Sequence, residues 1–270
     1  MDLDAYFARV GFEGERASTL QTLRELHLAH AQTIAFENLN PLLGWRVAID
    51  LPSVEAKLVR SGRGGYCFEQ NALLAAALRA LGFNVTGLAA RVLWNSAEDA
   101  IRPRSHMVLK IDLDGEPYIA DVGFGGLTLT APLRLLADVE QSTPHERFRL
   151  LNVDDGFKLQ ALVASAWKTL YRFDMQPQFD VDYEVSNHYT STHPQSHFRS
   201  MLIAALPVPG GRYALSNNQL TIHHIDAPSE RRLLSSVAEV RQVLESMFGL
   251  TLPAAAELDP ALARACGFQG

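Results

Sequence analysis

The segment 62–71 constrains the fold more than any other part of the chain. It reads Gly-Arg-Gly-Gly-Tyr-Cys-Phe-Glu-Gln-Asn, so three glycines lead into Cys67, and an apolar, helix-forming run, 68–81, follows directly. The pattern predicts a tight turn that opens a helix with Cys67 at its mouth. Unpaired backbone N–H groups and the helix dipole favour negative charge there, and the thiolate is the reactive form of cysteine. Most free cysteines are inert core residues, so a catalytic role requires partners elsewhere in the chain.

Composition bounds the class of protein. The chain has 270 residues, of which 47% are hydrophobic and 20% charged, and a net charge of -6. These values are ordinary for a globular protein with a real core, and they provide no global field that would recruit nucleic acid or an anionic membrane. Two cysteines, Cys67 and Cys266, make no disulfide framework, which favours a reducing cytoplasm. The start has no signal-peptide pattern, and the longest apolar run, 72–78, is too short to span a bilayer.

Hydrophobic periodicity divides the chain into three regions and predicts an α+β fold. Residues 1–83 are expected to form a helical domain that carries Cys67, and 84–190 an antiparallel β-barrel or sandwich. Residues 191–270 are expected to form a linker and a C-terminal α/β domain, with Pro207 and Pro209 marking a boundary. Capped helices are expected to start at Ser18 and Ser236. Strands are expected at 84–94, 106–113, 116–122, 128–134, 146–151, 156–163, 168–173, 212–216 and 219–225.

A predicted hairpin around Asp114-Gly115 supplies candidate partners for Cys67. A two-residue Asp-Gly loop pairs residue 113 with residue 116, so the numbers of paired residues sum to 229. His106 then lies opposite 123 and Asp121 opposite 108, which makes the two diagonal neighbours on one face of the hairpin. That diagonal is roughly 7–8 Å between backbones, within reach of a His–Asp hydrogen bond. A three-residue loop would place them on opposite faces.

A cysteine at a helix start and a histidine oriented by a carboxylate form a nucleophile–base–orienter arrangement. Asp121 would fix the tautomer of the imidazole and stabilise the imidazolium. His106 would take the thiol proton, and Cys67 would attack a carbonyl carbon and hold the acyl group as a thioester. Backbone N–H groups at the helix start are candidate oxyanion donors. The alternative interpretation of the hairpin is a surface His–Asp pair without a catalytic role.

Six motifs resemble those of the arylamine N-acetyltransferases and occur in that family's order. The similarity covers about residues 5–250, and its one departure is Ala35, where the family usually has proline. The cysteine motif is the most specific of the set. The motifs are Phe-Glu-Asn-Leu at 36–39, Arg-Gly-Gly-Tyr-Cys at 63–67, Ser-His-Met-Val-Leu at 105–109, Asp-Val-Gly-Phe-Gly at 121–125, Ser-Thr-His-Pro-Gln-Ser-His-Phe at 191–198, and the Arg-Tyr and Asn-Gln-Leu-Thr-Ile-His elements within 212–223.

The resemblance implies a helical N-terminal domain, a β-barrel and a C-terminal α/β lid around a cysteine-protease-like catalytic core. It also implies a ping-pong reaction, in which acetyl-CoA acetylates the cysteine and an arylamine, arylhydrazine or N-arylhydroxylamine then takes the acetyl group. Cys67, His106 and Asp121 match the catalytic positions. By the same resemblance, Phe36, Phe124 and Phe198 line the acceptor pocket, with core packing as the alternative, and Gly125 and Gly126 lie in the loop that approaches the CoA phosphates.

The family also pairs Glu37 with Arg63, which we interpret as support for the cysteine turn, with Arg9 helping in the same way. The histidines at 188, 193 and 197 match no zinc spacing, so no metal is predicted. Cys266 is expected to be a packing residue at a helix end.

Two other functions remain open at this point: a thiol hydrolase of papain or transglutaminase type, and a non-catalytic binder of aromatic ligands. Access of water to the thioester distinguishes a hydrolase from a transferase, because a transferase must exclude water from the thioester. The sequence leaves the acceptor amine, the preferred acyl chain and the oligomeric state open.

Overall fold

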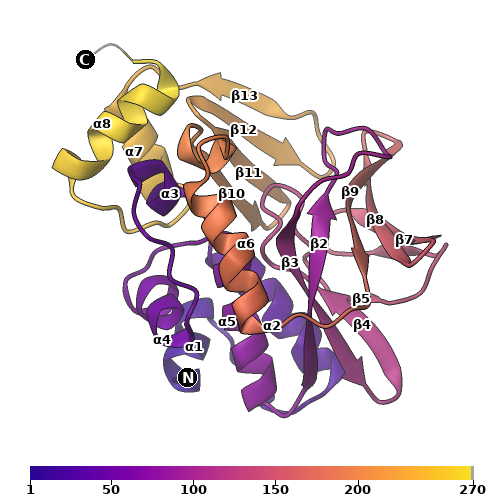
Figure 1. Cartoon of the computed structure of the whole chain (residues 1–270). Coiled ribbons are helices and arrows are strands. Elements are labelled where there is room, and N and C mark those ends of the chain that lie inside the picture. Colours follow the sequence, from indigo (N-terminus) through magenta and orange to yellow (C-terminus); the bar gives the residue numbers. More distant parts are fainter. Residues whose placement is uncertain (269–270) are drawn as a thin grey trace.

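The computed structural model describes residues 1–268 and contains three regions, which Figure 1 shows at its lower left, right and upper left. The first region is helical. Its elements are α1 (Leu3–Val10), α2 (Leu20–Thr33), α4 (Leu51–Val54), the π-helical turn η1 (Glu55–Arg60) and α5 (Cys67–Ala80). The short helix α3 (Leu39–Leu43) belongs to the same part of the chain but lies at the upper left of Figure 1, where it packs into the C-terminal core.

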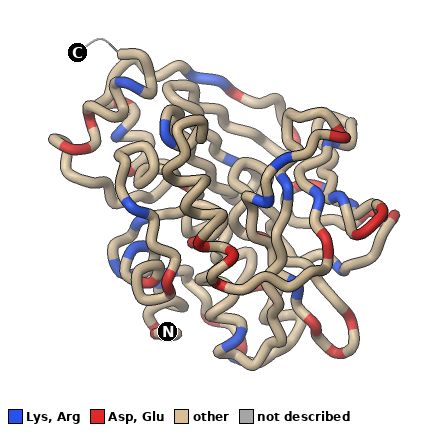
Figure 2. The backbone as a smooth tube through the Cα atoms, in the orientation of Figure 1, with Lys and Arg blue, Asp and Glu red and all other residues tan. Residues whose placement is uncertain are grey.

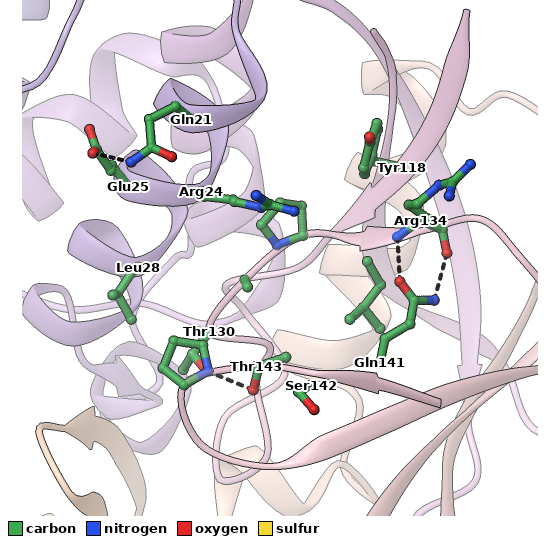
Figure 3. Close-up of a pocket in the computed structure, with 14 residues that line it drawn as sticks. Gln21, Arg24, Glu25, Leu28, Tyr118, Thr130, Arg134, Gln141, Ser142 and Thr143 are labelled. Atoms are coloured by element: carbon green, nitrogen blue, oxygen red, sulfur yellow. Dashed lines mark hydrogen bonds between the residues drawn. The ribbon is translucent and has the colours of Figure 1, made fainter. Parts of the chain in front are cut away.

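An eight-stranded antiparallel sheet forms the second region. Its edge strands approach each other through one side chain, since Gln141 accepts from the Arg134 N–H at 2.8 Å and donates to the Arg134 carbonyl at 2.9 Å (Figure 3). The sheet is therefore a nearly closed barrel. In spatial order the strands are β5 (Leu133–Arg134), β4 (Glu116–Ala120), β3 (Arg104–Leu113), β2 (Asn84–Val92), β9 (Ala166–Asp174), β8 (Gly156–Val163), β7 (Arg147–Val153) and β6 (Glu140–Ser142).

A five-stranded antiparallel sheet forms the third region, together with two helices. Its first strand comes from the helical region, so this sheet ties the N-terminal part of the chain to the C-terminal part. A helix, α6 (Asp180–Thr192), and a 3-10 turn, η2 (His197–Arg199), lead from the barrel into this sheet. The strands in order are β1 (Phe36–Glu37), β10 (Ile203–Val208), β11 (Gly211–Ser216), β12 (Gln219–His224) and β13 (Glu230–Leu233), and the helices are α7 (Val237–Ser246) and α8 (Ala255–Cys266).

Strand β3 separates two apolar cores. The odd-numbered side chains of the strand, 107, 109, 111 and 113, are buried in the core that also contains Cys67 and the apolar face of α5. Val108 points the other way, into the core that fills the barrel. A third core lies under the C-terminal sheet. The alternation of β3 therefore places the cysteine helix on one side of the strand and the barrel interior on the other.

Several predictions about local structure are confirmed. The fold class is α+β with the expected order of regions, and Cys67 is the first residue of α5. Residue 113 pairs with 116, as the Asp-Gly loop requires. The hairpin of β11 and β12 turns at 217–218, and α7 begins at its cap Ser236, whose side chain accepts from the Glu239 N–H. Cys266 ends α8, half-buried beside the C-terminal core.

Other predictions are wrong. Only the last two residues of the strand expected at 128–134 form β5, because the hydroxyls of Thr128 and Thr130 bond to loop and turn groups instead of facing a strand. Pro207 lies inside β10 rather than at a boundary. Strand β1 pairs only with 204 and 205, so proline lies where β10 has a neighbour on one side, a position that strands tolerate. The N-cap of α2 is Thr19, one residue after the predicted Ser18.

Helix α6 was not predicted, since its residues up to 190 were assigned to the barrel region. Its sequence is rich in Val, Tyr and Thr, which favour strands. Tertiary contacts along one helical face outweigh that preference: Tyr183 donates to the Leu88 carbonyl at 3.1 Å, and Asn187 donates to the Val47 carbonyl at 2.9 Å. The segment was expected only as part of the barrel region, with no element of its own, and that expectation is wrong for 180–190.

The turn of the β3–β4 hairpin yields a prediction about stability. Both loop residues have positive φ, 51° at Asp114 and 81° at Gly115, and a Cβ at Gly115 would meet no atom within 4 Å. Gly115→Ala therefore adds backbone strain without a clash, and we expect it to lower the free energy of unfolding by about 1–2 kcal/mol. Urea unfolding measures the effect. Asp114→Asn is the control, because asparagine adopts positive φ readily, and an equal loss in both variants would contradict the prediction.

Candidate active site

The glycine turn places Cys67 by pairing closely with β1. The Gly65 N–H donates to the Ala35 carbonyl at 3.3 Å, and the Glu37 N–H donates to the Gly65 carbonyl at 3.1 Å. A Cβ on Gly64 would lie 2.1 Å from the Ala35 carbonyl oxygen, so only glycine allows this approach. The first turn of α5 is thereby fixed against the strand that begins the C-terminal sheet.

Buried charged side chains on both sides of the glycine turn stabilise it. Arg63 donates to Glu37 from Nε at 3.1 Å and from Nη2 at 2.7 Å. Lys57 bonds to Glu69 at 2.7 Å, and Glu69 accepts from the Tyr66 N–H, which caps α5. Burial alone would raise the pKa of Glu37, but Lys57 and Arg63 hold that pKa below its usual value. The Glu37–Arg63 pairing predicted from the sequence is confirmed.

Arg9 does not join this group of charges. Its Nε donates to the Leu58 carbonyl at 3.1 Å, so it supports η1 rather than the cysteine turn. The prediction that Arg9 supports the cysteine turn is therefore wrong, because its guanidinium donates to a backbone carbonyl of the neighbouring π-helical turn.

His106 and Asp121 form the hydrogen bond that the hairpin register predicts. The His106 Nε2 lies 2.7 Å from the Asp121 Oδ2, and both side chains are buried. The ladder itself ends earlier than expected, at Leu109 and Ala120, so Asp121 does not pair with Val108 and His106 does not pair with residue 123. Asp121 turns away from β3 because its own side chain accepts from the Gly123 N–H, which starts a tight loop.

Five hydrogen bonds hold Asp121 in place. Besides the bonds from His106 and Gly123, its Oδ1 accepts from the Asn71 side chain at 2.9 Å, and its N–H donates to the Nε2 of His27 at 3.2 Å. Its carbonyl accepts from the Thr128 hydroxyl at 2.9 Å. The carboxylate thus has partners from α5, β3 and its own loop, as an ionised group in a core requires, and α2 holds the backbone of the same residue.

The electrostatics favour a charged histidine. Burial alone would lower the pKa of His106, but the charge and hydrogen bond of Asp121, with a contact from Cys67, raise that pKa to about 10. Burial would raise the pKa of Asp121, and His106 together with Asn71 and the Gly123 N–H holds it below its usual value. His106 uses Nε2 for Asp121, which leaves Nδ1 for the thiol.

Cys67 lies between these groups and a glycine of the Asp121 loop. Its Sγ is 3.7 Å from the Ser105 carbonyl oxygen, and its contact with His106 contributes to the raised pKa of the imidazole. A Cβ on Gly123 would be 2.6 Å from the Cys67 Cα, so this loop can pack on the start of α5 only because residue 123 has no side chain. The structure therefore brings Cys67, His106 and Asp121 together in one buried cluster.

A cavity of about 1690 Å³ opens onto Cys67 and His106. Phe36, Phe124 and Phe198 all line it, as do Gly125 and Gly126, so every binding residue suggested by the sequence lies on its wall. The Phe36 and Phe198 rings are 6.1 Å apart, and Phe124 meets the His106 ring edge-on at 5.4 Å.

The charges on the cavity wall differ from those of the rest of the chain. Acidic and basic positions are interspersed over the molecule (Figure 2), and the net charge is -6. The cavity lining instead holds four arginines and one carboxylate, Glu146. Both Glu146 oxygens bond to Arg212, and Arg147 pairs with Glu140 outside the cavity at 2.6 Å. The wall therefore presents positive charge from Arg102 and Arg231.

A second cavity, of about 490 Å³, lies between α2 and the β5–β6 edge of the barrel (Figure 3). Its lining includes Arg24, Leu28, Tyr118 and Thr143, and none of Cys67, His106 or Asp121. It has no nucleophile beside a base, so the larger cavity is the candidate active site.

Three further residues shape the site and were not predicted from the sequence. Asn71 could have been found, since it is a polar residue one helical turn after Cys67 and so lies on the same face of the helix. His27 gives no such signal. Tyr171, on β9, packs its ring 5.0 Å from the His106 ring, and it comes from a strand that only the closed barrel brings near.

Within residues 1–268, no three His, Cys, Asp or Glu side chains gather so that they could hold a metal ion. The same part of the chain has no helix with the length and apolarity needed to cross a membrane.

The sequence and fold match known proteins over nearly the whole chain. A family model described as N-acetyltransferase matches residues 19–257, so the fold and the cysteine site define an acyltransferase of that class. An arylamine N-acetyltransferase of Escherichia coli strain K12 is 45% identical over 249 residues, which are 92% of this chain and 88% of that protein. This chain belongs to the arylamine N-acetyltransferase family.

Solved structures agree. The arylamine N-acetyltransferase of Mycobacterium marinum in complex with CoA has a TM-score of 0.95 and 39% identity, with 98% of this chain and 100% of that chain covered. The enzyme of Mycobacterium tuberculosis has a TM-score of 0.94 and 40% identity, over 97% of this chain and 99% of that one.

The raised pKa of His106 leads to a prediction about the thiol. Because the imidazole keeps its proton to about pH 10, a thiolate at Cys67 would have a positive partner across the neutral range. We expect the rate of Cys67 alkylation by iodoacetamide to stay level between about pH 6 and about pH 9, whereas the rate for a free thiol, with a pKa of about 8.5, falls roughly tenfold per pH unit below that value. Mass spectrometry of the Cys67 peptide gives the rate.

Asp121→Asn provides the control for this profile. The amide cannot stabilise the imidazolium, so the alkylation rate of the variant should depend on pH like that of a free thiol. A wild-type profile that already rises through about pH 8.5 would show that no ion pair forms.

The charges under the turn yield a second prediction. Arg63→Met leaves Glu37 buried with Lys57, 3.8 Å away, as its remaining cation, and should lower the free energy of unfolding by about 3–5 kcal/mol. Urea unfolding checks this value. Glu37→Gln in the Arg63→Met background removes the unpaired charge and should restore part of the loss. No restoration in the double variant would mean that lost packing, rather than charge, destabilises the single one.

Proposed function

We propose that this protein transfers an acetyl group from acetyl-CoA to an arylamine, arylhydrazine or N-arylhydroxylamine through a thioester on Cys67. The observation that carries the proposal is the buried cluster of Cys67, His106 and Asp121 at the wall of a cavity large enough for both substrates. The family supports the reaction class, and the charge and aromatic lining of the cavity support the two substrates.

In the first half-reaction, His106 already holds the thiol proton as an imidazolium, and the Cys67 thiolate attacks the acetyl carbonyl carbon. The carbonyl oxygen becomes an oxyanion, for which the N–H groups at the start of α5 are the proposed donors. The carbon–sulfur bond to CoA then breaks, and the imidazolium returns its proton to the leaving CoA thiolate. Asp121 holds the imidazole in the orientation that both proton transfers need.

In the second half-reaction, the acceptor nitrogen attacks the carbonyl carbon of the acetylated Cys67. His106 takes a proton from the nitrogen, the carbon–sulfur bond breaks, and the thiolate re-forms its pair with the imidazolium. Each proton lost by one group is gained by another, so the cycle ends with the enzyme in its starting state.

The cavity wall suits a donor that carries phosphates. Arg102 and Arg231 supply positive charge in a protein that is negative overall, so attraction of a polyanion is local rather than global. Gly125 and Gly126 present backbone without side chains, and a Cβ on Gly126 would meet no atom within 4 Å. We therefore propose that this loop and the arginines contact the phosphates of CoA.

Aromatic rings near Cys67 suit a flat acceptor. Phe124 lies edge-on to His106, and Phe36 and Phe198 lie together on the wall of the same cavity. Rings in this arrangement offer faces and edges on which an aromatic amine can pack. The same apolar wall limits access of water to the thioester, which favours transfer over hydrolysis.

A reducing compartment suits this chemistry, because a reactive thiol must stay free of oxidation. We propose a cytoplasmic location on that ground. We also propose that the chain works as a helical domain at 1–83, a barrel domain at 84–190 and a linker with a lid domain at 191–270.

Incubation with acetyl-CoA alone tests the proposal. We expect intact-protein mass spectrometry to find one added acetyl group, and peptide mapping to place it on Cys67. Addition of an arylamine should remove the label and release the acetylated amine, with free CoA formed in equal amount over a panel of amines and hydrazines.

Cys67→Ala is the matched control and should gain no acetyl group. Equal labelling of the variant would refute the Cys67 thioester. Cleavage of peptide or glutamine substrates without acyl-CoA would instead favour a thiol hydrolase, and ligand binding without any turnover would favour an aromatic-ligand binder.

A further inference from the structure

Arg212, on β11, is an arginine of the C-terminal sheet that reaches into the barrel. Only 2% of the residue is exposed. Its Nε donates to one oxygen of Glu146 at 2.7 Å and its Nη2 to the other, while Nη2 also donates to the Thr128 carbonyl at 2.9 Å. Glu146 and Thr128 belong to two different loops of the barrel, so one side chain holds both loops against the C-terminal sheet.

Thr128 connects this contact to the active site. Its hydroxyl donates to the Asp121 carbonyl at 2.9 Å and accepts from the Phe124 N–H at 3.2 Å, and its own N–H donates to the Gly125 carbonyl at 3.1 Å. Thr128 therefore closes the loop 121–128, which carries the carboxylate partner of His106. Arg212 holds the carbonyl of this same residue.

The loop that carries Glu146 is anchored independently. His145 lies 2.9 Å from the Val208 carbonyl of β10 and 3.1 Å from the Thr130 hydroxyl, and the Thr143 hydroxyl donates to the Glu146 carbonyl at 2.8 Å. Figure 3 shows Thr130 and Thr143 side by side at this point, with hydroxyls 3.1 Å apart. The acceptor for Arg212 is thus held rigidly, so the guanidinium has one geometry.

Stability alone explains this arrangement poorly. A buried ion pair recovers little more than its desolvation cost, and apolar side chains of similar size often do as well. Arg212 bears a further cost, because its Nη1 is buried without a hydrogen-bond partner among the described residues. A planar, two-sided donor is needed where geometry matters more than net stability.

We propose that Arg212 is a positioning residue through which the C-terminal sheet fixes the loop 121–128 and so holds Asp121 in register with His106 and Cys67. It acts on the reaction through Thr128 and touches none of the reacting atoms. The inference rests on the proposed role of Cys67, and it assigns the C-terminal sheet a direct part in forming the site.

Two rates test the proposal: alkylation of Cys67 by iodoacetamide at pH 7, and acetylation of Cys67 at saturating acetyl-CoA in a single turnover. Arg212→Met should lower both by about tenfold or more, since a mispositioned Asp121 no longer stabilises the charged partner of the thiol. Arg212→Lys should recover part of each rate, because lysine keeps the charge but not the two-sided geometry. Arg232→Met is the matched control, as Arg232 lies in the same sheet and makes an exposed ion pair with Glu239.

Wild-type rates in Arg212→Met, with only the melting temperature lowered, would overturn the proposal. Thr128→Val decides the case if Arg212→Met does not fold. It removes the hydroxyl that joins the loop to Asp121 and leaves the carbonyl contact with Arg212 in place. Loss of both rates in Thr128→Val, with rescue in Thr128→Ser, is the expected result, and unchanged rates in Thr128→Val would also overturn the proposal.

The alkylation arm separates this inference from the proposed function. Alkylation needs no acyl donor, so it reports on the position of Asp121 even if acetyl-CoA is not the substrate. Failure of the acetylation of Cys67 in the wild type, with the alkylation pattern as expected, would refute the proposed function alone.

Discussion

A buried carboxylate is the constraint on which the rest of this structure depends. Asp121 is inaccessible to solvent, and an ionised carboxylate in such a place must have every lone pair engaged. The carboxylate accepts from His106 on β3, from Asn71 on α5 and from an N–H of its own loop. The backbone N–H of Asp121 donates to His27 on α2. The helical region and the barrel must therefore meet in one register, because a shift of either would leave the charge unpaired.

The same requirement explains why the three regions share their interiors. The core around Cys67 combines the apolar face of α5 with that of β3, and it also includes Ala205 of β10. Strand β1, from the helical part of the chain, pairs with β10 in the C-terminal sheet. The proposed division into three domains thus describes chain order better than independent stability. The site lies where these regions meet, so a loss of packing in any of them would change the position of Asp121.

Local chemistry decided what could be predicted from the sequence. The Cys67 turn and the 114–115 hairpin depend on glycines and on a two-residue register, so both could be predicted, and with them the bond between His106 and Asp121. The contacts of His27 and Tyr171 depend on how α2 and β9 pack, and no short-range pattern encodes that. Helix α6 was missed for the same reason, since its position depends on tertiary contacts with the Leu88 and Val47 carbonyls. The division into domains and the catalytic roles of the site residues stay predictions.

In the proposed reaction, the donor and the acceptor both reach the Cys67 thiol from the same cavity, which determines the order in which they react. The lining combines arginines and bare glycines with three phenylalanines, so it offers a polar wall and an aromatic wall to the same sulfur atom. Two acyl-bearing or acyl-accepting groups cannot both occupy the position within bonding distance of that atom. In the proposed reaction, a donor and an acceptor therefore approach Cys67 in turn, and the acetyl group stays on the enzyme between the two half-reactions. A covalent thioester, held away from water by the surrounding rings, meets that requirement within a single site.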